Sequence, residues 1–113
     1  MSEPASLPTV RVTPRIIPAD AVYAALNDSC RRAVLAALFD GQPRNGPALA
    51  GAIGRRFDDT RKHLDALVKS GLLVAGRDPE DNRRQIYRLA PSVKVAESPE
   101  GRTMDLGYCV MRL

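Results

Sequence analysis

The chain has 113 residues, enough for one domain with a single modest hydrophobic core. Hydrophobic residues make up 44% of it but aromatic residues only 4%, which favours an aliphatic core between packed helices over an aromatic-rich β-sandwich. The net charge of +4 is compatible with a nucleic-acid partner without requiring one. No apolar run is long enough to span a membrane and no signal-peptide pattern is present, so we expect a soluble, cytoplasmic protein.

The first 18 residues contain four of the nine prolines, so no helix can run through them. Within this stretch Val10 and Val12 alternate with Arg11 and Thr13, which is the period of a short strand. The prolines would restrict such a strand to a sheet edge, and an extended arm explains the pattern equally well. We therefore expect an extended N-terminal arm over residues 1–18, with an edge strand as the alternative.

A domain of helices and a hairpin is predicted over residues 19–90, beginning with a short helix at residues 19–27. The next helix should start after Asp28, because its carboxylate can accept hydrogen bonds from the amides of the first turn. Cys30 and Val34 then follow at a four-residue step, as on the apolar face of a helix.

Two further helices are predicted on either side of Gly54. The stretch "PALAGAI", residues 47–53, opens with a proline suited to a first helical position. The stretch "FDDTRKHLDALVKS", residues 57–70, places Leu64 and Leu67 on one face. Two helices joined by a short turn that contains glycine form a helix-turn-helix.

A β-hairpin is predicted next, from the strand-like runs at residues 72–77 and 84–89 and the turn-forming "DPEDNR" between them. Residues 91–104 contain prolines and a glycine and indicate an irregular link. The last segment, "DLGYCVMRL", is apolar on both sides and predicts a strand covered on both faces. We expect residues 91–113 to act as a linker and a C-terminal strand that builds a dimer or covers the core.

The ordered segments "ALNDSCRRAVLAALFDG", "LAGAIGRRFDDTRKHLDALVKSGLL" and "RRQIYRL" resemble the arsenical-resistance-repressor (ArsR) group of bacterial winged helix regulators. The likeness covers residues 24–89. It implies an α+β, mainly α fold: a winged helix-turn-helix with a β-hairpin wing, to which this chain adds extended N- and C-terminal segments. It also implies a sequence-specific DNA-binding transcriptional regulator, a repressor acting as a homodimer on a palindromic site.

The helix at residues 57–70 is the expected reader of double-stranded DNA, because a helix in the major groove must turn polar side chains outward while its apolar face holds it to the domain. With Thr60 and Leu64 inward, Arg61 and Lys62 can reach base edges or phosphates. Other arginines, in the turn and at the hairpin tip, could contact the backbone, although a solvated charge is the competing interpretation for each. The candidate DNA-contacting residues are Arg31, Arg55, Arg56, Phe57, Asp58, Arg61, Lys62, His63, Arg83 and Arg84.

Asp58 and Asp59 lie where this helix would meet a polyanion. Carboxylates near a helix start interact favourably with free amides and the helix dipole, by roughly 0.3–1 kcal/mol each. Asp58 could be the N-cap, or Asp59 could lie in the first turn. A carboxylate could also accept a hydrogen bond from cytosine N4. The pair predicts weaker non-specific DNA affinity and more dependence on the right site.

The chain departs from the metal-sensing members of the group, since residues 47–53 hold no cysteine and His63 is the single histidine. We therefore expect no metal site and no cofactor. Cys30 lies beside Arg31 and Arg32, where thiolate would be favoured, but a buried inert cysteine fits its apolar stripe better than a redox sensor. Cys30 and Cys109 do not make a disulfide framework. A small-molecule effector is left open.

A winged helix that serves as a protein-protein interaction module is the competing function, with its acidic helix start facing a partner. An enzyme is not expected, because no credible nucleophile-histidine arrangement or glycine-rich phosphate loop is present. We also expect the two termini to pair as strands, within one subunit or between two.

Overall fold

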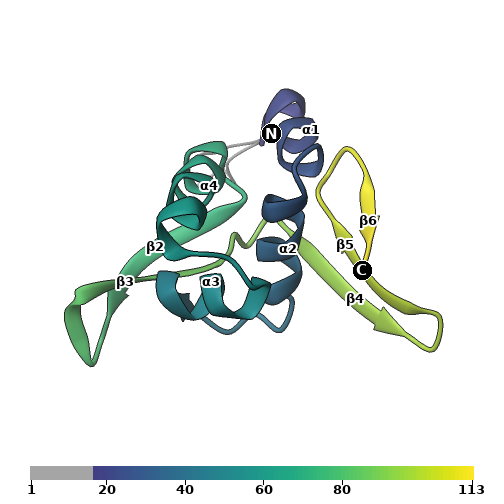
Figure 1. The fold of residues 1–113 in the computed structure, drawn as a ribbon. Helices are drawn as coiled ribbons and strands as arrows, with labels where there is room; N and C mark the ends of the chain where they lie inside the picture. Colours follow the sequence, from purple (N-terminus) through teal and green to yellow (C-terminus); the bar gives the residue numbers. More distant parts are fainter. Residues whose placement is uncertain (1–16) are drawn as a thin grey trace, which may run out of the picture.

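The computed structural model describes residues 17–113 as a helical body with a β-hairpin on one side and a second small sheet on the other (Figure 1). The extended arm expected over residues 1–18, and its pairing with the C-terminus, fall outside the described residues except for the last two positions of the arm. The elements are α1 (Ala19–Leu26), α2 (Ser29–Ala37), β1 (Arg44–Asn45), α3 (Gly46–Ile53), α4 (Phe57–Ser70), β2 (Leu73–Asp78), β3 (Asp81–Leu89), β4 (Lys94–Ser98), β5 (Gly101–Asp105) and β6 (Val110–Arg112).

The expected α+β winged helix-turn-helix is confirmed. The α3–α4 pair is followed by the β2–β3 hairpin, and the two-residue strand β1, which the sequence did not suggest, pairs with β3 to give the sheet order β1-β3-β2. No helix among the described residues is long and apolar enough to cross a membrane.

The start of α2 has the cap that the sequence predicted. The Asp28 carboxylate accepts a hydrogen bond from the backbone N–H of Arg31 at 3.0 Å, which satisfies one of the free amides of the first turn. This hydrogen bond is the main reason that the pKa of Asp28 is lowered from its ordinary value.

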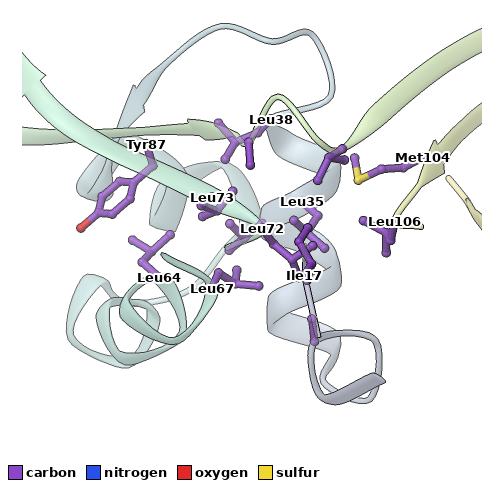
Figure 2. Packing of buried hydrophobic residues seen from close by; sticks show 14 of the residues in the cluster. Ile17, Leu35, Leu38, Leu64, Leu67, Leu72, Leu73, Tyr87, Met104 and Leu106 are labelled. Atoms are coloured by element: carbon purple, nitrogen blue, oxygen red, sulfur yellow. The ribbon is translucent and has the colours of Figure 1, made fainter. Parts of the chain in front are cut away.

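An aliphatic core joins the helices to the base of the hairpin (Figure 2). Leu35 of α2, Leu64 and Leu67 of α4 and Leu73 of β2 are almost completely buried, and Tyr87 of β3 packs beside them. Each fully buried leucine contributes roughly 1.5–3 kcal/mol to folding. Because Leu64 and Leu67 hold one face of α4 against this core, the opposite face of α4 is left to solvent.

The two strands of the hairpin that forms the wing extend further toward its tip than the sequence indicated. Leu73 pairs with Leu89 at the base, Asp78 pairs with Asp81 at the tip, and the register shifts between Arg77 and Asp78. The predicted six-residue connection is thus reduced to a two-residue turn, since the strands continue into its turn-forming residues.

The C-terminal segment is not the irregular link and single strand that the sequence predicted. Residues 94–112 instead form a three-stranded antiparallel sheet in the order β4-β5-β6. β4 and β5 join through Pro99 and Glu100, Gly101 is the first residue of β5, and Gly107, at φ 96°, lies in the turn before β6.

The prediction that the last strand is covered on both faces was also wrong. Among the residues that the structure describes, nothing covers one of its faces. Tyr108 is 50% exposed and Val110 62% exposed, and every residue of β4 is exposed. Met104 and Leu106 join the core, on the side of Leu35 away from the hairpin (Figure 2), and Cys109, Met111 and Leu113 are partly buried against it. The sheet therefore packs on the body through one side and leaves the other exposed.

Candidate nucleic-acid interface

The recognition helix α4 begins at Phe57, and Arg56 rather than Asp58 is its N-cap. The Arg56 side chain makes no capping hydrogen bond, and both Asp58 and Asp59 lie in the first turn. The suggestion that Asp58 caps the helix was therefore wrong. In the first turn, the two carboxylates interact favourably with the positive end of the helix dipole, and this accounts for an acidic pair at this place.

The two faces of α4 are divided as expected. Thr60 is fully buried, and its hydroxyl donates a hydrogen bond to the backbone carbonyl of Arg56 at 2.9 Å. Leu64 continues this buried face one turn later. Arg61 and Lys62 are exposed on the other side, where they can reach a ligand outside the domain.

The turn between α3 and α4 sets the orientation of α4 relative to α3. Gly54 adopts a left-handed conformation at φ 71°. At the other end of α3, the aromatic ring of Phe57 packs directly on Gly46, where a Cβ atom would collide with the ring. Arg55, in the turn, is exposed and its guanidinium approaches the Ser29 hydroxyl at 3.4 Å.

The wing brings its arginines to the same surface as α4. Arg83 and Arg84 are both exposed, and each contacts Asp81, at 3.2 and 3.6 Å. The hydrogen bond from the Arg83 side chain is the main cause of the lowered pKa of Asp81. Exposed pairs of this kind are weak, so both arginines remain free to bind another anion.

A hollow between the start of α4 and the wing collects four of the predicted residues. Its lining includes Phe57 and Arg61 of α4 and Arg83 and Arg84 of β3, together with Gln85. These residues come from segments more than twenty positions apart in the sequence. The fold thus builds one concave, cationic surface from the reading helix and the wing.

Arg31 and His63, also predicted to contact DNA, contact each other. The Arg31 Nε–H donates to His63 Nδ1 at 3.1 Å, between the first turn of α2 and the middle of α4. Because the guanidinium always carries this hydrogen, Nδ1 is the acceptor of the bond. The same nitrogen lies 4.0 Å from the Asp28 carboxylate.

Cys30 lies beside this contact and is buried, as the sequence favoured. Burial is the main cause of a raised pKa of the Cys30 thiol, and it outweighs the neighbouring Arg31, which lowers this pKa as the sequence suggested. The ligand atoms of Asp28, Cys30 and His63 all lie within 4.8 Å of one another. Counting only cysteines and histidines along the sequence missed this cluster, because the third group is a carboxylate and only the fold brings His63 to it.

No protein-family model matches the sequence, and neither does any curated protein. Solved structures do match. The homodimeric winged helix-turn-helix DNA-binding domain of Mb0332 from Mycobacterium bovis, a possible ArsR-family transcriptional regulator, is 33% identical with a TM-score of 0.56; the match covers 65% of this chain and 64% of that one. The cadmium metal-sensor CMTR from Mycobacterium tuberculosis is 33% identical with a TM-score of 0.53, over 65% of this chain and 72% of that one.

The transcriptional repressor CouR, bound to a 23-mer DNA duplex, is 29% identical with a TM-score of 0.56. This match covers 65% of the present chain and 51% of CouR. The chain therefore spans about half to two-thirds of the Mb0332 domain and CouR, and somewhat more of the cadmium sensor.

Proposed function

Since the chain belongs to the ArsR-type family of winged helix-turn-helix transcriptional regulators, we propose that it is a sequence-specific DNA-binding regulator of transcription. The observation that carries the proposal is the shared cationic surface of α4 and the wing. Arg61 of the helix and Arg83 and Arg84 of the hairpin line one hollow. Lys62 is exposed beside Arg61 on the helix. A major groove admits one helix of this kind, with the wing against the neighbouring backbone.

The remaining predicted residues have distinct roles in this proposal. Arg55 and Arg56, in the turn before α4, contact phosphates, and Phe57 forms part of the apolar lining of the hollow. Asp58 reads a cytosine amino group or repels unsuited sequences. The hydrogen bond between Arg31 and His63 uses only Arg31 Nε and His63 Nδ1, so the terminal N–H groups of Arg31 and Nε2 of His63 can contact DNA while it is in place.

We further propose that the protein is a repressor that acts as a homodimer on a palindromic site. The support is that CouR is a repressor and that the Mb0332 domain is homodimeric. A two-fold dimer would present its two recognition helices to half-sites about one helical turn apart. The exposed apolar residues of β4 and β6 supply a surface on which two copies could meet.

Selection of bound sequences from a random duplex pool tests the proposal in one experiment. The expected result is enrichment of a palindrome, which reports DNA binding, specificity and two-fold symmetry together. Enrichment of no duplex would contradict it, and binding to a protein partner through the acidic start of α4 would then be the better use of this surface.

The double variant Arg61→Ala/Lys62→Ala tests the assigned surface on the selected duplex. We expect it to abolish specific binding and to reduce the salt dependence by up to about two log units per log unit of salt, roughly one for each phosphate that the variant no longer neutralises. Lys69→Ala/Arg88→Ala removes the same charge from exposed positions that neither line the hollow nor belong to β4 or β6, and it should leave both quantities unchanged. Equal losses in the two double variants would show that only net charge matters and would remove α4 as the reader.

A further inference from the structure

A mixed cluster of sulfur, nitrogen and oxygen ligands lies between α2 and α4. We propose that Asp28, Cys30 and His63 bind one divalent cation of borderline or soft character, such as Zn²⁺ or Cd²⁺. The proposal corrects the sequence-based expectation of no metal site, and it does not depend on the proposed DNA binding.

The distances fit a small tetrahedral ion. The three ligand atoms lie within 4.8 Å of one another. Around Zn²⁺, with bonds of about 2.0–2.3 Å, neighbouring ligand atoms lie about 3.3–3.8 Å apart. The groups would therefore approach one another by about 1 Å, which small rotations of the side chains provide.

The chemistry of the three groups selects the class of metal. A thiolate and an imidazole nitrogen suit Zn²⁺, Cd²⁺ and Co²⁺, whereas Mg²⁺ and Ca²⁺ need oxygen ligands throughout. The Asp28 carboxylate and the Cys30 thiolate together supply two negative charges, which balance the dication. The Cys30 thiol must release its proton to solvent on binding, so affinity rises with pH. Three protein ligands leave a fourth position for water or another ligand.

The lone pair that the metal requires belongs to the His63 nitrogen that lies 4.0 Å from Asp28. Arg31 Nε donates to His63 Nδ1 at 3.1 Å, so this nitrogen carries no proton and faces Asp28. A bound cation would take this lone pair and release Arg31, whose side chain is only half-buried and can turn to solvent. Since Asp28 and Cys30 belong to the first turn of α2 and His63 to the middle of α4, the ion would join the two helices.

The test is a titration of the reduced, intact chain with Cd²⁺, followed by the ultraviolet thiolate-to-metal charge-transfer band. We expect one Cd²⁺ per chain. Cys30→Ser should eliminate the band, and Cys109→Ser, which removes the other thiol, should keep it. His63→Gln and Asp28→Asn should each weaken binding at least about tenfold. The asparagine can still cap α2, so that loss would not come from unfolding of the helix.

Two further measurements separate a built site from a reactive thiol. Co²⁺ should give the visible spectrum of tetrahedral coordination, and Cd²⁺ should raise the melting temperature of the unmodified chain but not that of Cys30→Ser. A band that survives Cys30→Ser, a band lost in Cys109→Ser, or unchanged affinity in both His63→Gln and Asp28→Asn would each overturn the site. Circular dichroism of every variant excludes misfolding as the cause.

Discussion

Helix α4 and the C-terminal sheet use their apolar residues in opposite ways. In α4 these residues recur at helical spacing, and Leu64 and Leu67 are buried against the body, so its other face is held in a fixed orientation. In the C-terminal sheet, every residue of β4 is exposed, and Val110 of β6 remains 62% exposed. The helix is positioned by its own domain, whereas the sheet presents apolar surface that its own domain leaves uncovered. Exposed apolar surface of this kind commonly marks an interaction site.

The sheet is nevertheless not a separate unit. Met104 and Leu106 are as deeply buried as the leucines of α4, and the guanidinium of Arg102 lies 4.9 Å from the ring centroid of Phe39, at the end of α2. Truncation after Pro91 would therefore expose the core as well as remove a candidate interface. Point substitutions separate these two effects.

The largest effect on stability is expected at α4. Leu64→Ala should lower the free energy of unfolding by about 2–5 kcal/mol, because it removes packed methyl groups from a site with no solvent exposure and leaves a cavity. Val95→Ala in β4 should change it by no more than about 0.5 kcal/mol, since Val95 is 43% exposed. Urea unfolding of both variants measures the contrast, and similar losses would show that the two regions contribute equally.

An intermediate effect is expected at the cap of α2. Asp28→Ala should cost about 1 kcal/mol, because the Arg31 amide loses its acceptor, whereas Asp28→Asn should cost much less. The folded-state pKa of Asp28 is lowered, so its ionised form contributes stability above the ordinary carboxyl pKa, and this contribution is lost as pH falls through the folded value. Unfolding measured at neutral and acidic pH should therefore show a smaller gap between the unmodified chain and Asp28→Ala in acid. A gap that widens in acid would contradict the assignment.

The smallest effect on stability, with the largest effect on association, is expected at β6. Val110→Glu should leave the free energy of unfolding within about 0.5 kcal/mol, since the side chain is mostly exposed. It should dissociate the proposed homodimer by placing a charge in an apolar interface. Sedimentation measures the mass, with Ala52→Glu on the exposed face of α3 as the matched control. A Val110→Glu dimer as tight as the original would place the interface elsewhere.

The sequence predicts best those elements that bury one face and expose the other. The helix at residues 57–70 has a polar and an apolar face, so its existence, its limits and its inward Thr60 were all predictable. The Asp28 cap was predictable because a cap is a local interaction. The placement of Arg61 and Lys62 outward followed from the same pattern, while their contact with DNA stays a prediction.

The features that the sequence did not predict depend on contacts between distant segments, or lie in strands whose residues do not alternate between buried and exposed. Strand β4 buries no residue, so it shows no alternation that would separate it from an irregular link. The approach of His63 to Asp28 joins positions 35 residues apart, and no spacing rule predicts it. The pairing of Arg31 with His63 was missed for the same reason.

The contact between Phe57 and Gly46 has a consequence for altering the protein. The ring at the first position of α4 rests on the backbone at the first position of α3, where the absence of a side chain leaves room for it. A methyl group at position 46 would displace the ring before it disturbed either helix, because the ring is partly exposed and free to rotate outward. A substitution at position 46 would thus change the shape of the hollow without changing its charged residues.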